Sequence, residues 1–182
     1  AALFFSAYIF MIWFYSHKLK KLPLTGLIIG AILSITPFFA IFVFYKNFSE
    51  VIFIHAAFLF FILLIRELIK DLENLKGDLA QNYITIPVKY GEYFTKLLIT
   101  ILVFLTLNPI YFLFKYPEIG KMSYYFFGAM GVLLGFLFFL WKASQKRHYV
   151  LLHNVLKLLI LAGIFSLTLV DTSVIIEKLI SF

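Results

Sequence analysis

The chain of 182 residues is 63% hydrophobic and 14% charged, and its mean hydropathy of +1.00 excludes an ordinary soluble domain. Its uncharged runs are long enough to cross a bilayer, which takes about 20 apolar residues per helix, so we predict an all-α, polytopic transmembrane helical bundle. The net charge of +7 is concentrated in the loops, which indicates orientation in a membrane rather than nucleic-acid binding, and the lack of cysteine excludes disulfides and thiolate metal sites.

The hydrophobic runs are separated by short polar stretches and predict six membrane-spanning helices. In chain order, the predicted spans cover residues 1–16, 22–45, 51–65, 93–114, 122–141 and 158–176. Pro37 and Asn108–Pro109 lie inside two of these spans and are expected to kink them. Pro87 and Gly91 argue against a continuous helix through the polar stretch 79–91, which precedes the fourth span.

The last span is ambiguous because Lys157 interrupts it. Either the helix starts near Tyr149 and the Lys157 side chain extends to the interface, or residues 149–156 lie along the interface and the span covers residues 158–176. We favour the second interpretation. No repeat or linker divides the chain, so residues 1–182 are expected to form a single membrane domain. Because the chain begins with Ala1 and without an initiating methionine, we expect it to lack its N-terminal part.

Basic residues concentrate on one side of this predicted topology. One set of alternating loops carries Lys18, Lys20, Lys21, Arg66, Lys70, Lys76, Lys89, Lys142, Lys146 and Arg147. The opposite set carries Lys46, Lys115, Lys121 and Lys178. Because basic loops stay in the cytoplasm, we expect a multi-pass protein of the cell (inner) membrane, with the charged stretch 66–78 and the basic loops on the cytoplasmic side.

The stretch 66–78 carries the densest charge in the chain, at the end of the third span. Glu67, Asp71, Asn74 and Asp78 are offset by four, seven and eleven positions, which places them within roughly 60° of one another on a helix. Lys70 borders this stripe. Carboxylate and amide oxygens at a membrane surface suit Mg²⁺ whose coordination is completed by a substrate phosphate. The alternative is a solvated helix end, where mixed charge is common.

These residues resemble a known family. The stretch 66–78, RELIKDLENLKGD, followed by residues 84–91, ITIPVKYG, is similar to the second aspartate-rich motif of the UbiA-type intramembrane prenyltransferases. The similarity extends upstream to Tyr15-Ser16, the basic loop, Pro23-Leu24 and the segment 34–37. On this resemblance the chain corresponds to the last six of nine helices of a UbiA-like fold.

The resemblance implies a prenyltransferase that uses Mg²⁺ to transfer a prenyl group from a prenyl diphosphate to a lipophilic acceptor within the membrane. Asp71 and Asp78 would be catalytic residues. The implied metal ligands are Glu67, Asp71, Asn74 and Asp78. The implied diphosphate-binding residues are Arg66, Lys70, Lys20, Lys21 and Tyr15. The expected partners are the prenyl diphosphate, the acceptor and membrane lipids, whereas the oligomeric state stays open.

Two departures from the family pattern limit this expectation. Asn74 stands where the family usually has aspartate, which removes one negative charge from the metal site. The first motif of the family, an Asn-Asp…Asp…Asp cluster on an earlier helix, is absent from the sequence. Apart from Asp71 and Asp78, the chain has only Asp171, which is predicted on the opposite side. Half of the expected site is therefore missing, and this chain alone is expected to be inactive.

Other functions and acceptors were weighed. Residues 70–78 most resemble the family members that alkylate glycerol-phosphate lipids. This resemblance favours a glycerol-phosphate lipid as acceptor, and otherwise an aromatic quinone precursor. The rival functions are a transporter or channel component with an acidic cytoplasmic ion entrance, and a non-catalytic membrane scaffold. His55, inside the third span, is expected to be structural. His153, Asn154 and Lys157 share a helix face and are expected to be interfacial anchors.

Overall fold

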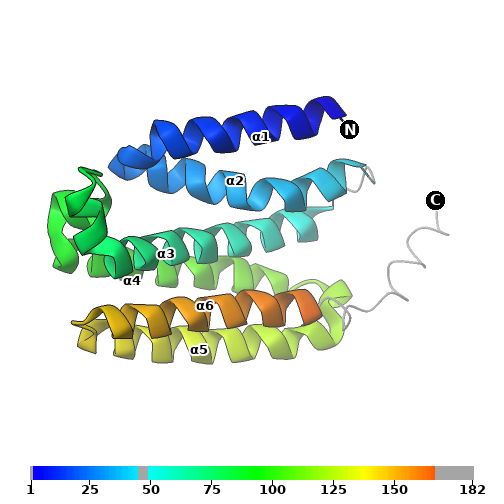
Figure 1. Ribbon diagram of the computed structural model, residues 1–182. Coiled ribbons are helices and arrows are strands. Elements are labelled where there is room, and N and C mark those ends of the chain that lie inside the picture. Colours follow the sequence, from blue (N-terminus) through cyan, green and yellow to red (C-terminus); the bar gives the residue numbers. More distant parts are fainter. Residues whose placement is uncertain (1, 45–48, 167–182) are drawn as a thin grey trace.

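The computed structural model describes residues 2–44 and 49–166, and this part of the chain forms a bundle of helices without strands (Figure 1). The helices are α1 (Ala2–His17), η1 (Leu19–Lys21), α2 (Pro23–Phe44), α3 (Glu50–Ala80), α4 (Ile86–Leu113), η2 (Pro117–Met122), α5 (Ser123–Lys142) and α6 (Lys146–Ser166), where η marks a short 3₁₀ helix. The all-α bundle predicted from the sequence is confirmed.

Within the described residues, five helical segments are long and apolar enough to cross a membrane, against the six that we predicted. The first predicted span corresponds to α1, whose 16 residues are the shortest of the set. The remaining spans correspond to α2, α3, α4, η2 with α5, and α6.

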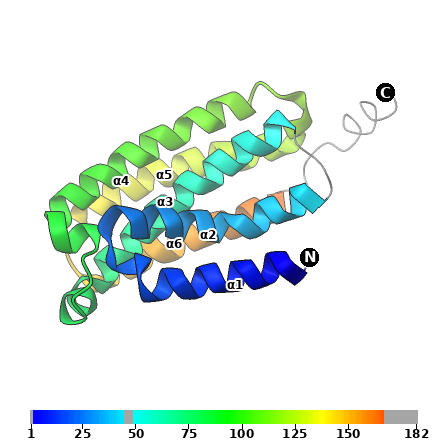
Figure 2. The same cartoon turned by 90° about the horizontal axis from the view of Figure 1, so that it is seen from above.

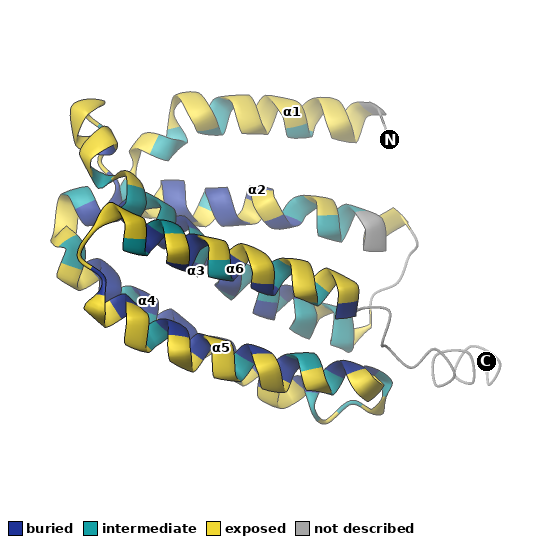
Figure 3. Ribbon diagram, turned by 60° about the horizontal axis from the view of Figure 1, so that its bottom comes forward, coloured by how far each residue is buried: buried dark blue, intermediate teal, exposed yellow. Residues whose placement is uncertain are grey.

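The central helix is α3, which packs against α2, α4 and α6. The helices run up and down side by side, with α2 on one side of α3 and α6 on the other (Figures 1 and 2). Ile62, Ile65, Leu68 and Ile69 of α3 are fully buried and form the middle of the core. Outward faces of the bundle carry many exposed large apolar side chains (Figure 3), as expected where lipid replaces water as the solvent.

The last helix differs from the interpretation that we favoured. Residues 149–156 do not form a separate interfacial segment, because α6 is one continuous helix from Lys146 to Ser166. Its buried face includes Tyr149, Leu152 and Leu156, which belong to the core, whereas Lys157 is exposed. A lysine that points away from the core does not interrupt a helix. The rest of the predicted span, residues 167–176, lies outside the described residues.

The stretch 79–91 is more helical than predicted, but the predicted break is present. Helix α3 continues to Ala80, and α4 starts at Ile86 with Pro87 in its first turn, where the missing N–H is tolerated. Gly91 has φ 85°, a left-handed conformation that interrupts the helix. A short helical turn before Gly91 is thereby set at an angle to the long apolar part of α4.

Candidate functional site

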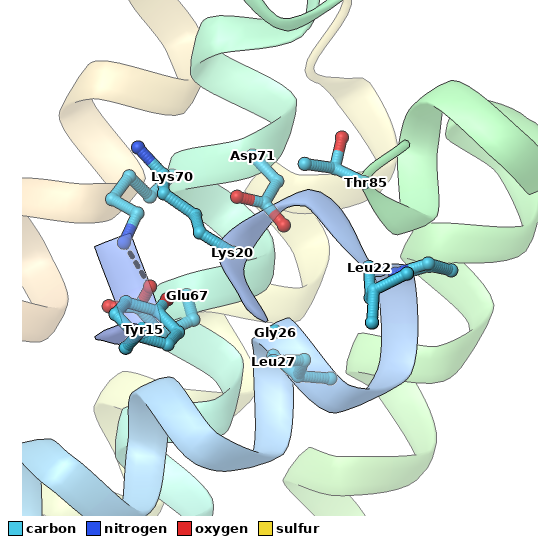
Figure 4. Close-up of a pocket in the computed structure, with 10 residues that line it drawn as sticks. Tyr15, Lys20, Leu22, Gly26, Leu27, Glu67, Lys70, Asp71 and Thr85 are labelled. Carbon is cyan, nitrogen blue, oxygen red and sulfur yellow. Dashed lines mark hydrogen bonds and ion pairs between the residues drawn. The ribbon is translucent and has the colours of Figure 1, made fainter. Parts of the chain in front are cut away.

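The charged half of α3 forms one wall of a small polar pocket at the end of the bundle (Figure 4). Opposite it lie the end of α1, η1 and the first turns of α2, and the loop before α4 closes one side. The free volume is about 10 Å³, enough for roughly one water molecule or ion. The lining residues are Tyr15, Lys20, Leu22, Pro23, Gly26, Leu27, Glu67, Lys70, Asp71 and Thr85.

Glu67 is the most buried carboxylate of the pocket and is already neutralised by neighbours on its own helix. Its relative exposure is 7%, and its carboxylate forms ion pairs with Lys70, one turn further on, and with Arg66 at 3.5 Å. Lys70 lines the pocket together with Glu67, whereas Arg66 does not. Arg66 therefore contributes to the site through Glu67.

Asp71 differs from Glu67 because its charge has no such partner. It lies beyond the apolar part of α3 and faces the pocket, where its carboxylate makes no hydrogen bond or ion pair with the residues that the structure describes (Figure 4). Burial raises its pKa to about 7; Lys70 and Lys20 lower it, and Asp78 and Glu67 raise it. A carboxylate in this state is stabilised by an added cation, which makes Asp71 the clearest candidate for a metal ligand.

Asp78 joins the site through the loop before α4. Thr85 Oγ1 donates a hydrogen bond of 3.3 Å to Asp78 Oδ2, and both residues are buried. Burial raises the pKa of Asp78, and the hydrogen bond from Thr85 opposes this shift. Thr85 precedes the first turn of α4 but its hydroxyl does not cap that helix, because it is directed to the carboxylate instead.

The 3₁₀ turn η1 holds Lys20 against the pocket. Gly26 permits this approach, since a Cβ at that position would lie 2.9 Å from the carbonyl oxygen of Leu19 and 3.1 Å from that of Lys20. The loop before α4 is tied to the same turn by a hydrogen bond of 3.2 Å from the Ile84 N–H to the Lys21 carbonyl. The Lys21 side chain itself is exposed and does not line the pocket.

Tyr15 lies where this pocket meets a second, larger cavity. That cavity has a volume of about 270 Å³ and shares Tyr15, Glu67 and Lys70 with the small pocket. The Tyr15 hydroxyl lies close to α2 at Gly30, where a Cβ would come within 2.6 Å of the hydroxyl oxygen. On the wall of the larger cavity, the hydroxyls of Tyr8 and Ser34 each donate to a main-chain carbonyl, both at 2.8 Å.

The structure brings together most of the predicted site residues. Tyr15, Lys20, Glu67, Lys70 and Asp71 line one pocket, and we refer to these five residues as the pocket cluster. Of the other predicted residues, Asp78 adjoins the pocket cluster through Thr85, Arg66 lies behind Glu67, and the side chains of Lys21 and Asn74 are exposed outside the pocket.

Among the described residues, no three His, Asp or Glu side chains converge closely enough to hold a metal ion alone. Mg²⁺ in proteins usually retains several water ligands and is also coordinated by substrate phosphates. One or two protein carboxylates are therefore enough to bind it. The donor set present here, hard oxygens with one unpaired carboxylate, fits that pattern. The sequence analysis placed Thr85 in the motif segment 84–91 but assigned it no role; its hydrogen bond to Asp78 is visible only in the structure.

A second charged cluster lies at the same end of the bundle. Lys96 is buried, and its ammonium group contacts Glu92 at 2.8 Å and the Ala143 carbonyl at 2.6 Å. The Tyr149 hydroxyl bonds to the same Glu92 oxygen at 2.6 Å. We refer to Glu92, Lys96, Tyr149 and the Ala143 carbonyl as the Lys96 cluster. It links α4, the α5–α6 connection and α6, and sequence reasoning did not identify it.

The histidines that we singled out have structural contacts. His55 Nδ1 bonds to the Val51 carbonyl at 2.8 Å, and its ring lies 5.5 Å from the ring of Phe126, which agrees with the expected structural role. His153 is buried and paired with Glu73, whereas Asn154 and Lys157 are exposed, so these three residues do not form one interfacial group.

Comparisons with known proteins agree with the geometry. A family model described as the UbiA prenyltransferase family matches residues 1–168. A digeranylgeranylglyceryl phosphate synthase of Methanobrevibacter smithii is 29% identical over 146 residues, which cover 76% of this chain and 48% of that relative. The chain thus spans about half the length of this curated relative. No solved structure matches the chain significantly.

Proposed function

Because the chain belongs to the UbiA prenyltransferase family, we propose that the protein of which it is part transfers a prenyl group from a prenyl diphosphate to a lipophilic acceptor, with Mg²⁺. One observation carries this proposal. Asp71, a partly buried carboxylate without a hydrogen-bond or ion-pair partner among the described residues, faces a pocket that also contains two lysines. Such a site attracts a cation and an anion together, as a metal–diphosphate complex requires.

The residues suited to hold Mg²⁺ are Asp71 and Asp78, with Glu67 beside them. Asp71 has no competing cation at ion-pair distance among the described residues, and Thr85 orients Asp78. Asn74 is exposed outside the pocket. It would take part in metal binding only with a metal–diphosphate complex that extends beyond the pocket. When bound, Mg²⁺ supplies charge neutralisation at the diphosphate, which makes it a better leaving group.

The cationic and hydroxyl groups of the pocket are suited to the diphosphate oxygens. Lys70 and Lys20 supply positive charge in the pocket that Asp71 lines, and Tyr15 supplies a hydroxyl at the junction of the two cavities. Lys70 would exchange part of its contact with Glu67 for a phosphate oxygen. Arg66 and Lys21 remain at the margin of the site, where they add to its positive potential.

The larger cavity next to the pocket is suited to the reacting ends of the two substrates. Departure of the diphosphate leaves an allylic cation that must be kept from water, and aromatic faces stabilise cations. Ile12, Leu33 and the aromatic rings of Tyr8 and Tyr15 line this cavity. Because Tyr8 and Ser34 donate their hydroxyl hydrogens to carbonyls, their oxygens are left as acceptors for a ligand hydroxyl.

For the acceptor we propose a glycerol-phosphate lipid. The relative named as a digeranylgeranylglyceryl phosphate synthase supports this choice, as does a cavity with hydroxyl-accepting oxygens beside Lys70. An aromatic quinone precursor is the alternative acceptor. We further propose that the pocket opens on the cytoplasmic side of the cell (inner) membrane, since the basic loops lie at that end of the bundle.

The proposal is tested with the full-length protein in lipid nanodiscs. A radiolabelled prenyl diphosphate is offered with a panel of acceptors, a glycerol-phosphate lipid and two aromatic quinone precursors, with Mg²⁺ and with EDTA. We expect labelled product from the glycerol-phosphate lipid only when Mg²⁺ is present. Product from a quinone precursor alone would mean that the acceptor is a quinone precursor and not a glycerol-phosphate lipid. A lack of product from every acceptor would reject prenyl transfer for this panel of substrates.

A further inference from the structure

The face of α3 that points away from the pocket is held by a buried pair, Glu73 and His153. Unlike the pairs Arg66–Glu67, Lys70–Glu67 and Lys96–Glu92, each of which lies within one helix, this pair joins two different helices. His153 Nδ1 of α6 lies 2.9 Å from Glu73 Oε2 of α3. Since a carboxylate only accepts, Nδ1 is the donor, and the pair fixes α3 to α6 at one defined point.

This pair is costly to bury, which argues against an incidental contact. The two side chains are only 11% and 19% exposed, and the second ring nitrogen of His153 is buried without a partner among the described residues. A buried polar group without a hydrogen bond destabilises a fold. Two apolar side chains would pack α3 against α6 without that penalty, so the pair provides something other than stability.

The position of Glu73 on α3 indicates what the pair provides. Glu73 is two residues from Asp71 and six from Glu67, so at 100° per residue it points about 200° and 240° away from them. In Figure 1, α6 accordingly lies on the side of α3 opposite to α2. Rotation or sliding of α3 would stretch the bond to His153 and, at the same time, move Asp71 relative to Lys20 of η1.

We propose that His153 is a positioning residue, which holds Glu73 and so fixes the rotation of the carboxylate-bearing half of α3 relative to η1. This inference rests on the proposed function, because the geometry that it protects is the binding site for Mg²⁺ and the diphosphate. Errors of about 1 Å in such a site can reduce rates a hundredfold. The pair itself does not touch the substrates.

The test separates positioning from stability with matched variants of the full-length protein. The double variant Glu73→Leu/His153→Leu removes both buried polar groups, so we expect its Tm to stay within a few degrees of the wild type. The single variant His153→Gln keeps an N–H donor for Glu73. The control, His55→Leu, replaces another partly buried histidine whose second ring nitrogen also lacks a partner.

Binding of inorganic pyrophosphate in the presence of Mg²⁺ is then measured by calorimetry. We expect the double variant to bind about tenfold more weakly although it stays folded, and His153→Gln and His55→Leu to bind within about twofold of the wild type. Wild-type affinity in the double variant would overturn the positioning role and leave the proposed function intact. A wild-type protein that binds no pyrophosphate would reject both.

A spectroscopic measurement keeps the inference testable if the double variant does not fold. The chain contains no cysteine, so spin labels can be placed at the exposed residues Lys76 of α3 and Thr25 of α2 through Lys76→Cys and Thr25→Cys. We expect the distance distribution between the labels to broaden with His153→Leu and to stay narrow with His153→Gln. Equal distributions in both variants would contradict the proposal.

Discussion

Two charged clusters lie at the same end of the bundle, and they differ in whether their charges are satisfied. In the Lys96 cluster, Lys96 and Tyr149 both bond to Glu92, and the lysine also donates to the Ala143 carbonyl. In the pocket cluster, Lys70 and Glu67 pair, but Asp71 has no hydrogen-bond or ion-pair partner among the described residues and faces free space.

The difference indicates which cluster binds a ligand. In the Lys96 cluster the buried lysine is bonded both to the partly exposed Glu92 and to a main-chain carbonyl, so its charge is already satisfied and such a network rigidifies the fold. An unpaired carboxylate with a raised pKa destabilises the free protein and is stabilised when a cation arrives. We therefore assign the Lys96 cluster to structure and the pocket cluster to binding.

The largest effect is expected at the unpaired carboxylate. Asp71→Asn should reduce prenyl transfer by roughly a thousandfold, because it removes the negative charge that would hold Mg²⁺. Since burial disfavours the charged form of this side chain, the Tm should stay the same or rise. Turnover of labelled prenyl diphosphate and thermal unfolding in the same nanodiscs are the measurements, with the exposed Lys76→Gln as control. Near-normal turnover would mean that Asp71 is not a ligand for Mg²⁺ in this site.

The Lys96 cluster should respond in the opposite way. Lys96→Met leaves Glu92 and the Ala143 carbonyl without their charged partner and should lower the free energy of unfolding by about 2 kcal/mol. Pyrophosphate affinity of the protein that remains folded should be unchanged. Chemical denaturation measures the first quantity and calorimetry the second, with the exposed Lys89→Met as control. A stable Lys96→Met protein that has lost pyrophosphate binding would reverse the two assignments.

A smaller effect is expected at Gly26, where the backbone of α2 closely approaches that of η1. Gly26→Ala would press a methyl group against the Leu19 and Lys20 carbonyls and shift η1, so the KM for the prenyl diphosphate should rise about tenfold. Gly77→Ala is the matched control, since no described atom lies within 4 Å of the added methyl group. If both variants have the same KM, the position of Lys20 at the pocket does not depend on this close approach.

The smallest effect is expected at the loop before α4. Thr85→Val removes one hydrogen bond of 3.3 Å to Asp78, so the Mg²⁺ concentration needed for half-maximal activity should rise about fivefold. Thr85→Ser keeps the hydroxyl and should restore most of the wild-type Mg²⁺ dependence. An identical dependence for the valine and serine variants would mean that the hydroxyl does not orient Asp78.

The sequence predicted the helical class and the face of α3 that lines the pocket, because both follow from local regularities. Long uncharged runs demand helices in a membrane, and the spacing of Glu67 and Asp71 places them on one face whatever surrounds them. The same spacing includes Asn74, which the structure leaves exposed. Helical periodicity predicts which residues share a face of the helix, but not how far along that face neighbouring segments bury them.

Other features depended on contacts between distant segments. Lys157 argued for a break in the last span, but α6 is continuous because that side chain lies on its exposed face. The diversion of Thr85 from helix capping to Asp78, and the pairing of Lys96 with the Ala143 carbonyl across 47 positions, require the folded loops. No local pattern specifies such contacts.

The most direct test of the two assignments is Mg²⁺-dependent binding of inorganic pyrophosphate, measured by calorimetry on the full-length protein and its Asp71→Asn and Lys96→Met variants. We predict that the wild type binds pyrophosphate with Mg²⁺ and not with EDTA, that Asp71→Asn abolishes this binding, and that folded Lys96→Met retains it. Undiminished Mg²⁺-dependent binding by Asp71→Asn would contradict the assignment of the pocket cluster to binding.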